Sequence, residues 1–473
     1  MASHRRLALA LLACTQFLLI LDTAIINVAV PSIGAELGIS PSGLSWVANA
    51  YLITFGGLLL FSGRAADLFG RRKLFAAGLA VLVPASLAGA LADGAAWLIT
   101  ARAVQGVGAA LAAASAFALL LTLFADGPER HKALGIFAAM AGAGGAAGTV
   151  LGGVLTSWLG WRSTFALNVV VGVVLIACTW RVLPEAREEG GGRGFDISGA
   201  LTVTGGLGLL AYALVNAGEA GWTAATTLVP AALAVLLLVA FAVIESRVAQ
   251  PLVPLKVLGR PTLRLANVLG GLAQMALFPM FFLVSLYMQA VLGFEPVAGG
   301  LGLLPLSLVV VVVAGATDRF IGRFGLRTVM AAGFVLIAAG LAWLSALSAH
   351  GSFTDDVLAP SIVLGVGLPL AAVTTNVAAT MDAGTDEVGL ASGLINTSQQ
   401  IGSVLGLAVL TAVASARTGT SDGPVALTSG FQAAFLVAAA ISAVAALLSL
   451  TLRTPAAVPP APAVESVAEG ASG

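Results

Sequence analysis

Residues 7–30 read LALALLACTQFLLILDTAIINVAV, and Asp22 is their only charged residue. A helix of this length and apolarity is long enough to cross the roughly 30 Å hydrocarbon core of a bilayer. The stretch follows Arg5 and Arg6 and lacks a clear cleavage site, so we expect a retained first helix rather than a removed signal peptide. It predicts a membrane protein that carries an acid inside the lipid-spanning region.

The composition of the whole chain indicates the same class. Of its 473 residues, 59% are hydrophobic and 9% are charged, and the mean hydropathy is +1.03. A water-soluble protein needs far more charge on its surface. The apolar runs are long and continuous, which favours helices over the alternating strands of a membrane barrel. Because the net charge is zero, we expect no nucleic acid as a partner.

The apolar pattern predicts an all-α polytopic membrane protein with fourteen spanning helices. Their approximate bounds are 7–30, 44–61, 74–92, 96–124, 133–156, 163–183, 199–216, 225–244, 264–290, 297–317, 328–349, 357–381, 389–415 and 430–452. If both termini are cytoplasmic, all but three of the 22 Lys and Arg fall in or beside cytoplasmic segments; the exceptions are Arg102, Arg162 and Arg417. This asymmetry follows the positive-inside rule and predicts a multi-pass protein of the cytoplasmic (inner) membrane.

Two longer polar connections divide the chain, one near residues 184–198 and one near 245–260. Six predicted spans precede the pair of spans between them, and six follow it. The expected parts are an N-terminal six-helix bundle over 1–183, a linker with two additional central helices over 184–260, a C-terminal six-helix bundle over 261–452 and a disordered cytoplasmic tail over 453–473.

A basic turn that contains glycine occurs in both halves. GRAADLFGRRK follows the second span at 63–73, and GRFGLR follows the tenth at 322–327. Two six-helix halves with a repeated turn are typical of transporters whose halves rock around a central site. The alternative is that short cytoplasmic loops are generally basic and contain glycine.

Four stretches of the chain carry a family resemblance. They are LDTAIINVAVP at 21–31, GRAADLFGRRK at 63–73, RAVQGVG at 102–108, and the glycine-rich residues 142–153 followed by WRSTFALN at 161–168. Together they resemble the major facilitator superfamily and, more narrowly, its fourteen-helix drug:proton antiporters. The resemblance implies a major facilitator fold and the export of drugs, antibiotics or related small amphiphilic molecules in exchange for protons.

The chain departs from that family pattern at three places, one of which is the second basic turn, where Gly322 stands in place of the usual aspartate. Thr149 follows Gly148 where the fifth-helix motif usually has a proline, and Asn168-Val169-Val170 also lacks one. The fifth-helix motif is associated with antiport, so the direction of transport is less firmly implied. The alternatives are a dedicated exporter or importer of a single metabolite, and a membrane sensor that uses the same fold without transport.

Asp22 and Arg102 are the candidate proton-coupling residues. A charged group near the middle of a spanning helix costs roughly 2.5–3.5 kcal/mol on insertion scales, so a buried acid is a functional candidate. Asp22 can bind and release a proton, or it can merely hydrogen-bond neighbouring helices. The resemblance implies that Arg102 assists proton transfer; the alternative is an arginine that snorkels to the outer boundary. We expect the two side chains to contact each other.

The first basic turn predicts a conformational latch. Its candidate residues are Gly63, Arg64, Asp67, Gly70, Arg71 and Arg72. An acid among bases can break and remake ion pairs as the halves move. The positive-inside rule alone explains the bases but not Asp67.

Glycines in the fifth span predict close helix packing. Gly144, Gly148 and Gly152 are four residues apart and share one face, with Gly153 beside them. Small residues let two backbones approach within a membrane. We expect this stripe to act as a packing hinge between the two halves.

Polar residues within the spans are candidates for a substrate cavity. They are Asn27, Gln105, Gln274, Gln289, Asn396 and Gln399, and Phe278, Phe281 and Phe282 could supply aromatic walls. For each polar residue, a hydrogen bond between helices is the alternative. No second acid lies in mid-membrane, so we expect neutral or singly charged substrates rather than dications.

The sequence carries no signature of an enzyme. It has no Walker motif, and its three histidines and two cysteines lack the spacing of metal ligands. We therefore expect no catalytic residue, metal or cofactor, with a proton gradient as the energy source. The expected partners are a small-molecule substrate, protons and the lipid bilayer, and the expected state is a monomer. Lysine occurs only at 73, 132 and 256, which favours a bacterial source of high GC content.

Overall fold

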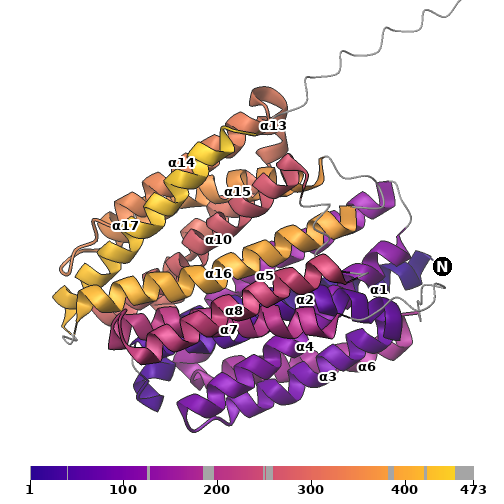
Figure 1. The fold of residues 1–473 in the computed structure, drawn as a ribbon, viewed down its shortest axis with the longest axis horizontal. Coiled ribbons are helices and arrows are strands. Elements are labelled where there is room, and N and C mark those ends of the chain that lie inside the picture. Colours follow the sequence, from indigo (N-terminus) through magenta and orange to yellow (C-terminus); the bar gives the residue numbers. More distant parts are fainter. Residues whose placement is uncertain are drawn as a thin grey trace, which may run out of the picture.

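The computed structural model describes residues 2–39, 41–124, 128–184, 196–248, 251, 259–381, 388–419 and 423–452, and its elements there are helices (Figure 1). The first-half elements are α1 (Ala2–Leu37), α2 (Pro41–Phe69), α3 (Arg71–Ala90), α4 (Ala95–Leu123), α5 (Pro128–Leu159) and α6 (Arg162–Val182), followed by α7 (Ile197–Ala220) and α8 (Ala225–Arg247). The second-half elements are α10 (Pro261–Leu286), η1 (Tyr287–Val291), α11 (Pro296–Gly302), α12 (Leu304–Ala314), α13 (Thr317–Phe324), α14 (Leu326–Leu344), η2 (Phe353–Leu358), α15 (Ala359–Thr380), α16 (Val388–Thr418) and α17 (Pro424–Ser449). The predicted disordered tail at 453–473 lies outside the described residues.

The predicted helical membrane fold is confirmed. In the described part of the chain, 13 helical stretches are long and apolar enough to cross a membrane. α2 supplies the fourteenth span, since its described apolar stretch, Gly43–Leu59, falls just short of that length within a longer helix. The least certain part of the predicted count, residues 199–244, forms two separate helices, α7 and α8.

The first helix is longer than expected. α1 continues through Pro31 to Leu37, where the sequence predicted a connection after residue 30. A proline is tolerated in a spanning helix when neighbouring helices satisfy the freed backbone groups. The additional turns also have partners, because the Glu36 carboxylate accepts a 2.7 Å hydrogen bond from the Trp161 indole and pairs with Arg162. These contacts hold the end of α1 against the start of α6.

The spanning helices form two bundles that meet along a central seam. In the first bundle α1 packs on α5 and α4 packs on both α2 and α3; in the second, α10 packs on α16 and α14 packs on α15 and α17. The seam includes contacts of α2 with α16, of α5 with α11 and α12, and of α1 with α10 and α11. Any movement of one bundle against the other must rearrange these contacts.

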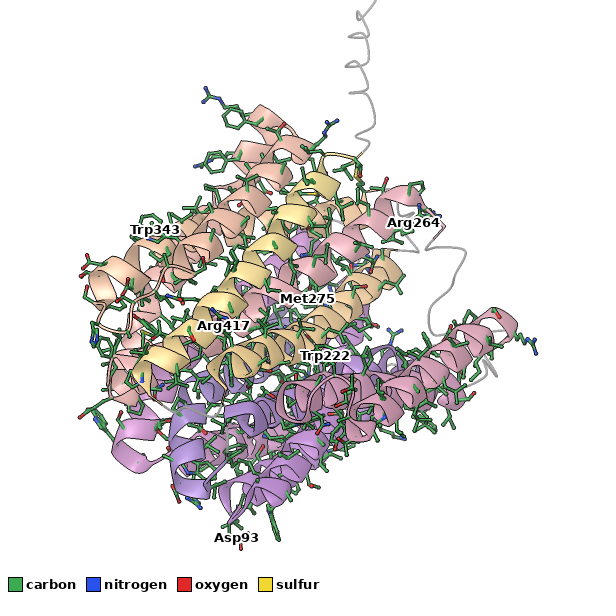
Figure 2. The ribbon with its side chains drawn as sticks, turned by 60° about the vertical axis from the view of Figure 1, so that its left-hand side comes forward. Asp93, Trp222, Arg264, Met275, Trp343 and Arg417 are labelled. Atoms are coloured by element: carbon green, nitrogen blue, oxygen red, sulfur yellow. The ribbon has the colours of Figure 1, made fainter. Side chains whose placement is uncertain are left out.

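The two additional helices form a hairpin across the seam. α7 packs on α2 from the first bundle and on α16 from the second, and α8 packs on α7. Figure 2 shows this hairpin along the outside of the bundles, with Trp222 in its turn. α8 exposes apolar side chains such as Val229 and Leu236, as expected of a helix that faces lipid.

Candidate functional site

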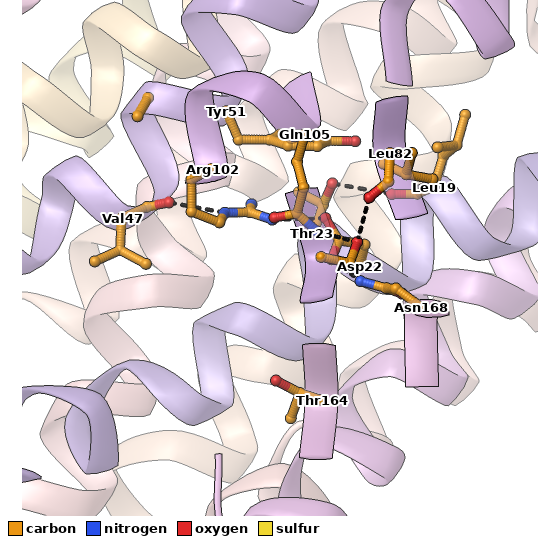
Figure 3. A network of polar contacts seen from close by, with 12 residues as sticks. Leu19, Asp22, Thr23, Val47, Tyr51, Leu82, Arg102, Gln105, Thr164 and Asn168 are labelled. Atoms are coloured by element: carbon orange, nitrogen blue, oxygen red, sulfur yellow. Dashed lines mark hydrogen bonds and ion pairs between the residues drawn. The ribbon is translucent and has the colours of Figure 1, made fainter. Parts of the chain in front are cut away.

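Asp22 and Arg102 form a buried ion pair within the first bundle (Figure 3). Asp22 on α1 is 3% exposed and Arg102 on α4 is 1% exposed. One guanidinium nitrogen of Arg102 donates a 2.7 Å hydrogen bond to Asp22 Oδ2. The contact expected from the sequence is therefore present, and the arginine does not snorkel outward. Two charges can remain buried at this depth because each neutralises the other.

The guanidinium of Arg102 has further partners on α2 and on α4 itself. Arg102 Nε donates to the carbonyl of Val47 on α2 at 3.0 Å, and a terminal nitrogen donates to Gln105 Oε1 at 3.0 Å. Gln105 in turn donates to Ser86 Oγ on α3 at 2.7 Å. The aromatic ring of Tyr51 lies over the guanidinium, 4.3 Å from the Arg102 Cζ atom. Charge-assisted hydrogen bonds and a cation–π contact together offset the loss of hydration.

Asn168 completes the carboxylate site. Its side-chain amide on α6 donates to Asp22 Oδ1, so both carboxylate oxygens have a partner. Asn168 is 1% exposed. This residue belongs to the stretch at 161–168 that carries the family resemblance, but it was not among the predicted site residues. A carboxamide inside an apolar helix was the available signal, but hydropathy does not show which helix it faces.

A close approach of α4 to α2 sets this geometry. Gly106 lies against Thr54 and the backbone of Tyr51, and a Cβ atom there would overlap both. The Thr54 hydroxyl donates to the carbonyl of Ala103 on α4 at 2.8 Å. The glycine one turn after Arg102 therefore lets α2 present both the Val47 carbonyl and the Tyr51 ring to the guanidinium.

A cavity of about 360 Å³ lies between the two bundles. Its walls come from α1, α2 and α5 on one side and from α10, α12, α15 and α16 on the other. The predicted cavity residues Asn27, Gln274 and Gln399 line it, as do the aromatic candidates Phe278 and Phe281. The volume lies within the range of about 300–1,000 Å³ typical of pockets for small molecules.

The other three predicted polar residues do not line this cavity. Gln105 is fully buried in the ion-pair network. Gln289 donates to the carbonyl of Val28 and to Ser285, both at 3.1 Å, so it joins helices. Asn396 is exposed on α16. Phe282 is fully buried elsewhere in the core. A polar residue in a spanning helix can face any neighbouring helix. The residue type alone therefore did not distinguish positions that line the cavity from positions that do not.

Tyr51 connects the cavity to the ion pair. Its ring stacks on Phe55 with centroids 5.7 Å apart, and both rings line the cavity. The same ring covers Arg102. Thr23, the neighbour of Asp22, also lines the cavity, whereas Asp22 and Arg102 do not. A molecule in the cavity would therefore contact the residues that shield the pair without touching either charge.

The predicted latch is only partly described. Gly70 adopts a positive φ of 98° directly before α3, a conformation that favours glycine at this turn. Arg71 donates to Thr122 on α4, and Arg72 donates to the carbonyl of Leu183 at 3.1 Å. These bonds lie within the first bundle. A Cβ at Gly63 would meet no atom within 4 Å, and the side chains of Arg64 and Asp67 lie outside the described residues.

The glycine stripe packs on a different partner than expected. Gly144, Gly148 and Gly152 face α1, where Cβ atoms would lie 2.6–3.0 Å from the carbonyl oxygens of Phe17, Leu21 and Ile25. The expected hinge between halves is therefore wrong for these three residues, which join two helices of one bundle. Of the four glycines, Gly153 faces the other bundle, where a Cβ atom would lie 2.7 Å from the carbonyl oxygen of Pro296 on α11. Periodicity identified the packing face but not the helix that covers it.

Replacing Gly148 by alanine is expected to destabilise the α1–α5 contact. The new Cβ atom would lie 2.7 Å from Ala24 Cβ and 2.9 Å from the Leu21 carbonyl, and such overpacking typically costs about 1–3 kcal/mol. Thermal unfolding of the purified protein in detergent would show a lower midpoint. Gly135→Ala on the same helix is the control, because a Cβ there meets no atom within 4 Å. Equal midpoints for the two variants would contradict the observed packing.

The bundles are joined near the ends of α1 and α5. The backbone N–H of Val297 donates to Ser157 Oγ at 2.9 Å, and Gly300 lies against the Thr149 carbonyl. The bond from Gln289 to Val28 lies at the same level. The cavity extends from here toward the start of α1, where Gln16 forms part of its wall. The seam is thus closed on one side of the cavity.

Comparison with known proteins gives a consistent family. The profile of the Major Facilitator Superfamily matches residues 12–407. The chain is 41% identical over 453 residues to the cephamycin export protein CmcT of Amycolatopsis lactamdurans, covering 94% of this chain and 91% of that protein. It is 36% identical over 455 residues to the puromycin resistance protein pur8 of Streptomyces alboniger, covering 94% and 90%.

Solved structures agree on the fold. An auto-inhibited peptide transporter of the POT family superposes with a TM-score of 0.69 at 16% identity, covering 97% of this chain and 99% of that one. A bacterial homologue of the lysosomal transporter Spinster, in an inward-facing and unoccupied conformation, superposes with a TM-score of 0.66 at 15% identity, covering 94% and 96%. From the profile, the relatives and the fold, this chain belongs to the major facilitator superfamily of membrane transporters.

Proposed function

We propose that this chain exports antibiotic-class small molecules from the bacterial cytoplasm in exchange for protons. The observation that carries the proposal is the buried Asp22–Arg102 pair, which Tyr51 separates from a drug-sized cavity at the seam. The export and resistance functions named for its relatives support the same direction and substrate class. A proton-coupled exporter needs a group that can bind and release a proton.

The proposed orientation places the protein in the bacterial inner membrane with both termini in the cytoplasm. In this orientation the closed side of the seam, at Val297 and Ser157, faces outward. The cavity then extends toward the cytoplasm along α1, so a substrate would load from the cytoplasmic side. A monomer contains the whole cavity, and the proton gradient is the energy source without a cofactor.

Protonation of Asp22 would change the packing of α1. A neutral carboxyl loses its ionic attraction to Arg102, while Arg102 keeps its bond to Val47 on α2. Neutralisation therefore weakens the link from α1 to α4 more than the link from α4 to α2. Because α1 also carries the cavity residues Gln16, Thr23 and Asn27, the same movement alters the substrate site. Proton binding and substrate release are in this way coupled through one helix.

Reconstituted vesicles test the proposed function. Purified protein in liposomes would be given a pH gradient, and uptake of a fluorescent dye and several antibiotics would be followed with and without an ionophore. We expect gradient-dependent accumulation that the ionophore abolishes. Transport that does not respond to the gradient would contradict proton exchange, movement with the protons would indicate an importer, and absence of any flux would favour a sensor. Transport of one compound from a broad panel would indicate a dedicated exporter.

The ring of Tyr51, rather than its hydroxyl, is expected to support coupling. Its contact with Arg102 is buried, where a cation–π contact contributes up to about 2 kcal/mol. We expect Tyr51→Phe to retain most of the gradient-driven transport rate. The rate of Tyr51→Leu should fall by about tenfold or more. Initial rates at several substrate concentrations would separate this loss from a change in substrate binding. Equal rates for Tyr51→Leu and the parent would contradict the role assigned to the ring.

A further inference from the structure

Among the described residues, no charged side chain lines the cavity between the bundles. The polar residues in its wall carry only carboxamide and hydroxyl groups, and they include Asn27, Tyr51, Gln274, Gln399 and Gln400. Asp22 and Arg102, which lie behind Tyr51, neutralise each other. A charged ligand would have to lose its hydration here without gaining a counterion, which is strongly unfavourable.

Asn27 supplies an unsatisfied hydrogen-bond acceptor at this cavity. Its side chain is 6% exposed and forms part of the cavity wall. Its Oδ1 atom is buried and has no hydrogen-bond partner among the described residues. A buried acceptor without a partner costs about 1–3 kcal/mol, so a turn of the side chain that brings this oxygen to the cavity surface, where a ligand donates to it, would be favourable. The position thus points to a donor group on the bound molecule.

The opposite wall offers groups that complement a neutral ligand. Gln274 on α10 and Gln399 and Gln400 on α16 present carboxamides, each of which can donate and accept. Phe278 and Phe281 supply apolar surface beside them. A flat, mostly apolar molecule can therefore lie against the aromatic rings while its polar groups reach amides on either bundle. Such contacts across the seam would tie the position of the ligand to both bundles.

We propose that this cavity binds an uncharged amphiphile and orients it through a hydrogen bond from an O–H or N–H group of the ligand to Asn27 Oδ1. The inference rests on the proposed export function and adds the substrate class and the anchoring residue. The protein then selects its substrate by the absence of net charge and by one donor group. Permanent cations and anions of the same shape are poor ligands of this site.

Equilibrium binding to the full-length protein in lipid nanodiscs tests this. The probes are a fluorescent aminomethylcoumarin with a primary arylamine, its dimethylamino counterpart, which lacks the donor, and its trimethylammonium counterpart, which is a permanent cation. We expect the parent protein to bind the primary amine about fivefold more tightly than the dimethyl compound, because a ratio of affinities of this size corresponds to the free energy of one hydrogen bond of ordinary strength. We expect the cation to bind at least about tenfold more weakly than either.

Variants separate the anchor from general effects on the fold. Asn27→Ala should reduce the affinity for the primary amine to that for the dimethyl compound and leave the latter unchanged, which also shows that the site is intact. Asn49→Ala is the matched control, because Asn49 is fully buried on α2, its side chain has no hydrogen-bond partner among the residues that the structure describes, and it does not line the cavity. Gln274→Glu should increase the affinity for the cation by placing a negative charge in the wall.

Several results would overturn the inference. The parent protein could bind all three probes with equal affinity, or fail to bind the neutral probes. Asn27→Ala could lower the affinities for both neutral probes equally. Gln274→Glu could leave the affinity for the cation unchanged. The proposed export function fails on a different measurement, namely the absence of gradient-driven flux in vesicles. Gradient-driven flux, together with binding that does not depend on the charge or the donor group of the probe, would leave the export function intact and refute only the inference.

Discussion

Replacing Asp22 by asparagine is expected to reduce gradient-driven efflux to the level of vesicles that lack the protein. Asparagine preserves the size of the side chain and can still accept from Asn168, but it has no titratable group. If proton release at this position drives export, the pH gradient can no longer perform work. Initial rates of substrate uptake into everted vesicles, at several imposed gradients, would measure this loss.

Two further variants define what the loss means. Asp22→Glu retains a carboxyl group one methylene longer and is expected to keep part of the gradient-driven rate. Asp93→Asn removes an exposed acid at the turn between α3 and α4, and its rate should equal that of the parent. Substrate binding to purified Asp22→Asn should persist, because Asp22 does not line the cavity. Efflux by Asp22→Asn that still follows the gradient would exclude Asp22 as the coupling group.

Replacing Arg102 by glutamine is expected to cause the largest loss of stability. The substitution leaves the Asp22 carboxylate buried at 3% exposure without its cation, and breaking a buried pair in this way costs about 3–5 kcal/mol. The bonds to the Val47 carbonyl and to Gln105 are lost as well. The thermal midpoint and the yield of monodisperse protein in detergent would both fall.

The double variant Asp22→Asn with Arg102→Gln distinguishes an ion pair from two independent contacts. Neutral partners of similar shape leave no buried charge unpaired, so we expect the double variant to be more stable than Arg102→Gln alone. Its gradient-driven transport should remain absent. Additive losses of stability in the double variant would show that the two residues do not act as a pair.

The sequence was sufficient for the fold because lipid restricts the choice of structure. Apolar stretches of spanning length set the helices, including the hairpin of α7 and α8, and Asp22, the acid well inside the first predicted span, identified the position of the ion pair. The end of α1 was misplaced at Pro31, because hydropathy does not show the partners, Trp161 and Arg162, that stabilise its last turns. Helix bounds therefore depend on tertiary contacts that a single apolar pattern does not contain.

The lateral pairing of helices was the part that sequence reasoning could not supply. In a spanning helix all faces are apolar, so the pattern that reveals a buried face in a soluble protein is weak. For this reason Asn168 was not predicted beside the Asp22 carboxylate, and Gln105 was predicted to line the cavity, although it hydrogen-bonds Arg102 and does not line it. Likewise, Gly148 was expected at the seam but packs on α1. Each error concerns which helix a correctly recognised residue faces.

The most direct test of proton exchange at Asp22 is proton release on substrate binding. Purified protein in a weakly buffered solution with a pH indicator would be mixed with a compound shown to be transported in the vesicle assay. We predict release of protons in proportion to the bound compound by the parent protein, and none by Asp22→Asn at the same occupancy. Binding without proton release by the parent, or equal release by the two proteins, would contradict the account.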